Sequence, residues 1–242
     1  MRFKRYGDMD IDELLVKKRR RKAKQGEMIR WNTIVSNLLH QSFFYLDSTE
    51  RWMRILWELL PSGIMYLLLV RVFTSQHHIA LLIITVVFVH VLNWILNNNF
   101  WNCMNCALPW LKNQGVEKTL LYLNAMRRRL EKHKQITGLM FLGSLCRFEW
   151  HDRSDIDVRI LRAPGFLNGI IASFLISRER FLAFVYRQPL DVYLADSPEF
   201  LKRHRVDEKP IFTIRRDSRI NDVDFPGQVV IELLPTTFNL SK

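Results

Sequence analysis

An apolar run of eighteen residues at 79–96, without Lys, Arg, Asp or Glu, constrains the fold of this chain more than any other feature. A helix needs about 20 apolar residues to cross the hydrocarbon core of a bilayer, within a range that starts near 17. A second apolar segment at 52–73 precedes the run across the short connector 74–78. The two segments predict a transmembrane helical hairpin over residues 51–97. The alternative is a helical hairpin buried within a soluble protein.

Positive charge is concentrated ahead of this hairpin. The chain carries a formal net charge of +12, and six consecutive basic residues occupy 17–22. Lys and Arg are enriched on the cytoplasmic side of membrane helices, so we expect an integral membrane protein with two transmembrane helices and both termini in the cytoplasm. Basic residues near a membrane attract anionic phospholipid, the partner we expect for the basic and amphipathic N-terminal region 1–50. Nucleic acid is not expected as a partner, because the basic residues cluster beside the hairpin.

Polar side chains form a stripe on the second apolar segment. His90, Asn93 and Asn97 fall at i, i+3 and i+7. Polar groups at such a depth usually pair with another helix, so the stripe predicts helix packing or self-association, as a homo-oligomer or with a partner membrane protein. We disfavour a proton or ion path, because we expect no carboxylate to join the stripe. Four tryptophans near the helix ends fit an interfacial aromatic belt: Trp52, Trp57, Trp94 and Trp101.

Residues 98–135 connect the hairpin to the rest of the chain. The tryptophan-bearing stretch 97–114 predicts a segment at the membrane interface, and 116–135 has the periodicity of a basic linker helix. Cys103 and Cys106 form a lone CxxC pair. Zinc or redox chemistry would need a second pair of ligands, so we interpret these cysteines as small residues near the membrane surface.

The C-terminal region 136–242 alternates apolar strand-like runs with helical periodicity. It predicts an α+β fold, a small mixed β-sheet with flanking helices. The strands are expected at 139–142, 156–161, 189–194 and 211–214, the helices at 166–185 and after the Ser197-Pro198-Glu199 start signal, and an extra strand or docking segment at 229–234.

Three aspartates of this region point to metal-ion chemistry. Asp155 and Asp157 stand two positions apart at a strand, so their side chains share one face of the sheet. Asp191 lies near the start of the third strand. Carboxylates on adjacent strands can hold two Mg²⁺ ions, which clamp the two oxygens of an in-line phosphoryl displacement. The turn at Gly143 and Ser144 would let the backbone approach a triphosphate.

These residues resemble the nucleotidyltransferase superfamily of DNA polymerase beta, and its minimal domains most closely. The resemblance rests on Gly143-Ser144, a spacer, Ser154-Asp155-Ile156-Asp157-Val158 and the later Asp191. It implies transfer of a nucleoside monophosphate from an NTP to an acceptor hydroxyl with release of pyrophosphate. It also implies that the three aspartates are catalytic and bind Mg²⁺ or Mn²⁺, and that Gly143 and Ser144 contact the triphosphate.

Further residues around the motif are less specific. Arg147 and Ser154 are candidates for nucleotide contact, although Arg147, like Arg153 and Arg159, can equally be a solvated charge. The spacer carries Phe148 and Trp150 where relatives often have a small residue. We expect these two aromatics either to reshape the nucleotide entrance or to mark a site specialised for another donor.

No helical acceptor-binding domain follows residue 196. The expected function is therefore Mg²⁺-dependent nucleotidyl transfer to a membrane-associated acceptor, either a lipid-linked glycan or a lipid headgroup, on the cytoplasmic face. Two alternatives stay open. One is a non-catalytic nucleotide-sensing or scaffold subunit of a membrane complex. The other is a glycosyltransferase that uses the Asp155-Ile156-Asp157 motif to bind a metal and a nucleotide sugar.

Overall fold

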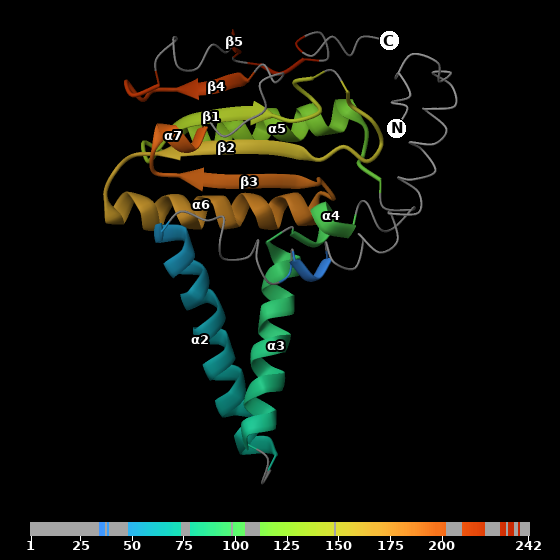
Figure 1. Ribbon diagram of the computed structural model, residues 1–242, viewed down its shortest axis with the longest axis vertical. Coiled ribbons are helices and arrows are strands. Elements are labelled where there is room, and N and C mark those ends of the chain that lie inside the picture. The colour runs from blue at the N-terminus through green and yellow to red at the C-terminus, as the bar shows by residue number, and fades with distance from the viewer. Residues whose placement is uncertain are drawn as a thin grey trace, which may run out of the picture.

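The computed structural model describes residues 34–36, 38, 48–73, 78–97, 99–104, 112–147, 149–201, 210–220, 228–230, 232–234 and 237. The basic run 17–22, most of the amphipathic segment 28–50 and Phe148 lie outside these residues, as do Cys106 and the side chain of Cys103. Within the described part, a sheet flanked by helices sits at the wide end of a pair of long helices (Figure 1). The predicted α+β class is confirmed.

The hairpin consists of α2, Ser48–Val72, and α3, His78–Leu96. Both helices are long and apolar enough to cross a membrane, as predicted. Their apolar side chains point outward; Ile79, for example, is 77% exposed. α2 starts earlier than expected, at Ser48, because its first turn packs on the sheet unit. Trp94 departs from the predicted aromatic belt, since it is buried and packs edge-on against Phe100 of α4, Asn99–Met104.

The polar stripe of α3 faces α2. His90 Nδ1 lies 3.0 Å from Glu58 Oε1, and Asn93 donates to the Trp57 carbonyl at 3.2 Å. Asn97 donates to the carbonyl of Asn93. The packing role predicted for the stripe is therefore confirmed within one chain. The expectation that no carboxylate joins the stripe is wrong, because Glu58 reaches it from the other helix.

The sheet unit follows the hairpin and matches the predicted elements closely. Its remaining elements are α5 Val116–Glu131, β1 Ile136–Leu142, β2 Ile156–Arg162, α6 Phe166–Val185, β3 Leu190–Ala195, α7 Pro198–Leu201, β4 Ile211–Arg215 and β5 Gln228–Val229. The C-terminal tail both forms β5 and docks on α5, where the backbone N–H and C=O of Leu233 bond the Asn124 side chain.

The strands form one mixed sheet in the order β3-β2-β1-β4-β5. β1 pairs antiparallel with β2 and β4, whereas β2 pairs parallel with β3. A parallel pair needs a crossover connection, and α6 supplies it. This β2-α6-β3 unit brings the Asp155-Asp157 segment beside Asp191.

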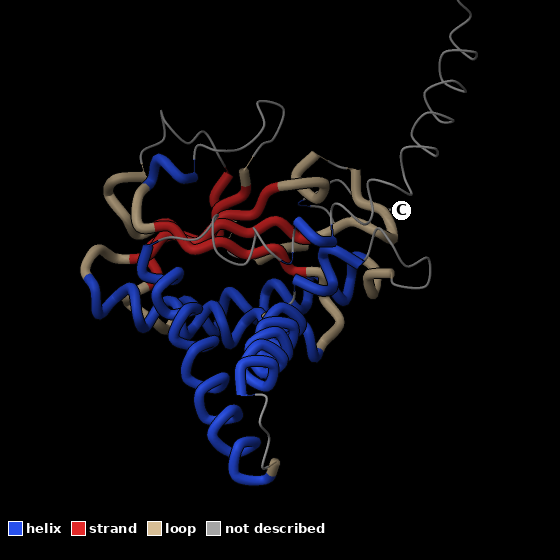
Figure 2. The backbone as a smooth tube through the Cα atoms, turned by 60° about the horizontal axis from the view of Figure 1, so that its bottom comes forward, coloured by secondary structure: helices blue, strands red, loops and turns tan. Residues whose placement is uncertain are grey.

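The two faces of the sheet differ. Ile156, Val158 and Ile160 point into the main core with α5 and α6, and Figure 2 shows most helices on one side of the strands. The intervening residues of β2 point to the other face, which a smaller apolar cluster with Leu201 of α7 covers at one end. α5 differs from the predicted linker helix. Its apolar side, including Leu123, is buried in the main core, so the compact unit begins at residue 116 rather than 136.

The first turn of α2 fastens the hairpin to the sheet unit. Thr49 lies so close to Gly169 of α6 that a Cβ there would fall 2.7 Å from the Thr49 methyl. Glu50 forms a buried ion pair with Arg180 of α6, which also donates to the Val192 carbonyl of β3 at 2.6 Å. One arginine therefore joins α2, the crossover helix α6 and the edge strand β3.

Candidate active site

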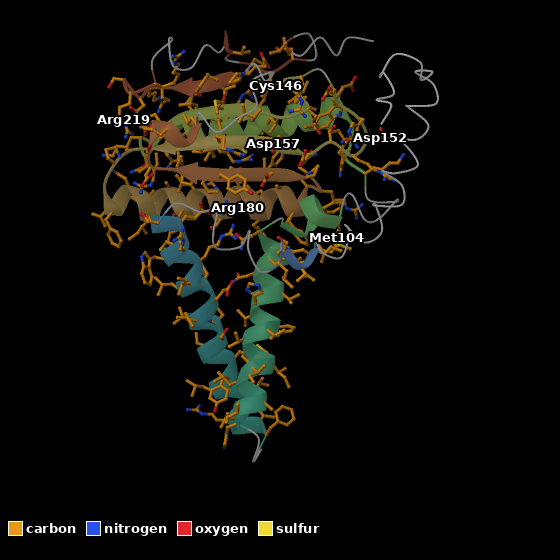
Figure 3. The ribbon with its side chains drawn as sticks, in the orientation of Figure 1. Met104, Cys146, Asp152, Asp157, Arg180 and Arg219 are labelled. Carbon is orange, nitrogen blue, oxygen red and sulfur yellow. The ribbon has the colours of Figure 1, made fainter. Side chains whose placement is uncertain are left out.

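The predicted aspartates converge at the β2–β3 pair. Asp157 and Asp191 are direct partners in the parallel register, and Asp155 immediately precedes β2. Alternation along each strand buries Ile156, Leu190 and their neighbours and places the carboxylates on the opposite face. Figure 3 labels Asp157 on β2 and Arg180 beside α6, above the hairpin.

The turn after β1 closes against this carboxylate face. Leu142, the last residue of β1, is the antiparallel partner of Asp157. Gly143 follows with φ of +77°, a conformation that side chains rarely adopt. A Cβ at this position would lie 2.9 Å from the Asp157 Cγ and closer still to its Oδ2. Only glycine fits here, because the backbone itself packs on the Asp157 carboxylate.

Ser144 presents a hydroxyl that has no partner in the described part of the chain. The turn is held by bonds from the N–H groups of Cys146 and Arg147 to the Gly143 carbonyl, at 3.1 and 3.2 Å. Within this turn the Ser144 Oγ is buried and has no hydrogen-bond partner among the described residues. A buried hydroxyl without a bond is costly, and a bound phosphate oxygen at this position would satisfy it.

Burial raises the pKa of two of the three aspartates. The pKa of Asp191 is raised to about 6, chiefly by burial and also by the nearby charge of Asp155, against the opposing effect of Arg159, Arg180 and the Tyr193 hydroxyl. Burial also raises the pKa of Asp155. Carboxylates that resist ionisation together favour a bound cation, since the cation stabilises their charged forms.

Basic side chains flank the carboxylate face. The Arg159 guanidinium lies over the Tyr193 ring, 4.4 Å from its centroid. Arg147 lowers the pKa of Asp155 through its charge and bonds Glu149 at 3.0 Å. These arginines are placed to meet an anionic ligand beside the aspartates.

The oxygen-only donor set suits Mg²⁺, which prefers hard oxygen ligands and keeps several waters. In the described residues, the side chains as they lie do not gather three or more metal-binding groups around one point. Metal binding by Asp155, Asp157 and Asp191 stays a prediction that rests on their shared face and on the raised pKa values of Asp155 and Asp191.

No protein-family model, curated protein sequence or solved structure matches the chain. The family resemblance therefore rests on the residues and geometry described above.

Two of the predicted ligand and entrance residues have structural roles. Ser154 is buried, and its Oγ accepts a hydrogen bond from the His151 N–H at 2.9 Å, so it holds the turn before β2. The Trp150 side chain packs against the main core, so it has a structural role there. Nucleotide contact by Arg147 and Ser154 stays a prediction.

Sequence reasoning missed Tyr193, Arg180 and Glu50. Strand alternation from Asp191 could have placed Tyr193 on the same face. No local pattern pointed to the ion pair of Glu50 with Arg180, because the two residues lie 130 positions apart.

A cavity of about 250 Å³ lies where α2, α3 and α6 meet. Its lining mixes apolar and polar side chains, among them Arg54, Trp57, Asn93, Asn97 and Phe181. Glu58 also lines it, so the cavity offers a basic and an acidic group beside apolar walls at the end of the hairpin that meets the sheet unit.

Proposed function

We propose that this chain is a membrane-anchored, Mg²⁺-dependent nucleotidyltransferase of the DNA polymerase beta superfamily. The observation that carries the proposal is the packing of the Gly143 backbone on Asp157, itself paired with Asp191. A glycine-serine turn against paired carboxylates brings triphosphate-binding and metal-binding groups together. The buried Ser144 hydroxyl supports the same assignment.

The proposed reaction is an in-line displacement at the α-phosphorus of an NTP. An acceptor hydroxyl oxygen attacks this phosphorus, the bond to the bridging oxygen of the β-phosphate breaks, and pyrophosphate leaves with the electron pair. Mg²⁺ held by the three aspartates would neutralise negative charge on the triphosphate. Asp191 is also positioned to accept the proton of the attacking hydroxyl.

The proposed acceptor is a hydroxyl of a lipid-linked glycan or a lipid headgroup. Cytoplasmic NTPs require the sheet unit to face the cytoplasm, with both termini on that side. The junction cavity supports a membrane-borne acceptor with a polar headgroup, because Arg54 and Glu58 lie there beside apolar walls at the end of the hairpin. Anionic phospholipid at the basic N-terminal region would hold the unit close to its acceptor.

The direct test uses the full chain in native membranes with Mg²⁺ and each α-³²P-labelled NTP. The expected result is label in the organic-extractable fraction together with released pyrophosphate. Asp157→Asn should lower this transfer by about 10³-fold, since removing a metal ligand costs roughly 4 kcal/mol of transition-state stabilisation. The matched control Asp152→Asn changes an exposed carboxylate of the neighbouring turn and should retain activity.

Nucleotide binding without transfer or pyrophosphate release by the wild-type chain would reject the enzyme and favour a nucleotide-sensing subunit. Release of a nucleoside diphosphate from a nucleotide sugar would indicate a glycosyltransferase instead.

A further inference from the structure

The crossover helix α6 carries an exposed apolar stripe that the sheet does not use. Leu167, Ile171, Phe174, Phe181 and Val185 are between 41% and 72% exposed. Their spacing of three and four residues, with Arg178 between Phe174 and Phe181, places them on one side of the helix. The opposite side, with Ala172 and Ile176, is buried in the main core.

This stripe faces the hairpin side of the molecule. The Phe174 ring contacts Trp57 of α2 at 5.5 Å between centroids. Phe181 lines the junction cavity together with Leu96 and Asn97 at the end of α3. Figure 1 shows α6 running across the wide end of the hairpin, with both long helices on its far side from the sheet.

The length of α3 indicates how far α6 lies from the surface of a bilayer that the hairpin crosses. α3 has 19 residues, which corresponds to about 28 Å at 1.5 Å per residue. The hydrocarbon core is about 30 Å thick. A hairpin whose α3 crosses this core therefore brings α6 to the membrane surface where α3 ends. The longer α2, with 25 residues, extends past the core there, and its Thr49 packs on Gly169 of α6.

The charges of α6 also suit a lipid surface. The only acidic residue of α6, Glu179, is fully buried and paired with Arg129 at 2.6 Å and Arg178 at 2.9 Å. The exposed charges from 166 to 187 are Arg178 and Arg187, both positive. This helix thus presents apolar side chains with basic residues and no exposed acid, as interfacial membrane helices do.

We propose that α6 lies in the plane of the membrane, with the stripe of Leu167, Ile171, Phe174, Phe181 and Val185 inserted at the headgroup–acyl boundary. In this arrangement three helices, α2, α3 and α6, attach the sheet unit to the bilayer, rather than α2 and α3 alone. The inference rests on the hairpin crossing the bilayer but not on nucleotidyl transfer.

The test measures the membrane depth of single nitroxide labels in the full chain. In a background with Cys103→Ser, Cys106→Ser and Cys146→Ala, single cysteines replace Leu167, Ile171 or Val185 in turn. Each labelled chain is reconstituted in phosphatidylcholine–phosphatidylglycerol nanodiscs that hold one chain, without NTP. Accessibility to oxygen and to a water-soluble nickel chelate is then compared.

Two matched positions calibrate the depth. Leu234, 48% exposed near the opposite edge of the sheet, should report water, and Ile84, 62% exposed on α3, should report the bilayer interior. The expected result is a several-fold loss of nickel accessibility at the three α6 positions relative to Leu234, with depths shallower than that of Ile84.

Nickel accessibility at α6 equal to that at Leu234, with Ile84 protected, would overturn the proposal. Protection of α6 that appears only in discs loaded with two chains would also overturn it, because a second copy would then cover the stripe. Water exposure of Ile84 would refute the spanning hairpin itself. None of these outcomes depends on nucleotidyl transfer, which the labelled-NTP assay tests separately.

Discussion

Asp157 of β2 and Asp191 of β3 stand side by side as partners in a parallel strand pair. The α6 crossover creates this pairing between residues 34 positions apart in the chain. Because the strands are in parallel register, the Asp155-Asp157 face continues directly onto Asp191. The candidate site therefore depends on strand register, and several consequences can be measured.

The pH dependence of stability should report Asp191. Its pKa rises from 3.8 to about 6 through burial, so the folded state binds more protons between these values and stability falls as pH rises from about 4 through 6. The full loss corresponds to about 3 kcal/mol. Thermal unfolding in detergent with EDTA, from pH 4 to 8, should show a larger fall for the wild-type chain than for Asp191→Asn, in which the raised pKa of Asp155 still contributes.

Mg²⁺ should shift this transition to lower pH, because a bound cation stabilises the carboxylates. Identical pH profiles for the wild-type chain and Asp191→Asn would contradict the burial-driven pKa, and an unchanged midpoint with Mg²⁺ would argue against the metal site.

Gly143→Ala should damage both stability and transfer. Gly143 and Gly115 both have positive φ, +77° and +86°, and replacing glycine in such conformations costs about 1–3 kcal/mol. Only at Gly143 would the new Cβ collide with the Asp157 carboxylate, whereas nothing lies within 4 Å of a Cβ at Gly115. We expect Gly115→Ala to keep nucleotidyl transfer and Gly143→Ala to lose it at temperatures where both stay folded. Equal thermal midpoints and equal activities of the two variants would count against the close packing.

Ser144→Ala should weaken NTP binding without lowering the stability of the chain. Its Oγ is buried without a partner among the described residues, so the alanine variant should be as stable as the wild-type chain or more so. If the hydroxyl bonds a phosphate oxygen, its loss should weaken NTP binding by about 10- to 100-fold, equivalent to 1.5–3 kcal/mol. Ser173→Ala is the control, since Ser173 Oγ of α6 is equally buried and equally without a partner in the described structure. Unchanged NTP affinity of Ser144→Ala in a calorimetric titration would remove this serine from the triphosphate site.

Glu50→Gln should loosen the junction between hairpin and sheet unit. Glu50 and Arg180 are each at most 2% exposed, and removing one charge of a buried pair costs about 3 kcal/mol or more. Glu232→Gln, at an exposed pair 4.0 Å from Arg128, should change stability by less than about 1 kcal/mol. Thermal midpoints of the two variants provide the comparison. A similar small loss for both would show that the buried pair does not hold the junction.

The sequence by itself determined the local features of this protein. An uncharged run of eighteen residues can be little other than a buried or membrane helix, and the period-two pattern at 156–161 can only place alternate residues on opposite faces. The helix at 166–185 followed from such patterns with its bounds, and β2 and β3 within one residue at each end, whereas β1 begins at Ile136, three residues before the predicted start. Asp155 and Asp157 were found because they stand two positions apart on one strand, and Asp191 because it lies near the start of another predicted strand of the same region.

Only the tertiary structure decided which distant residues meet. It paired Glu58 with His90, brought Glu50 to Arg180, and placed α5 in the core instead of in a linker. It also turned the apolar stripe of α6 toward the hairpin. Contacts of this kind depend on how helices pack and on which face of the sheet each helix covers. Shape complementarity and burial across the whole unit determine these contacts, so no short stretch of sequence predicts them.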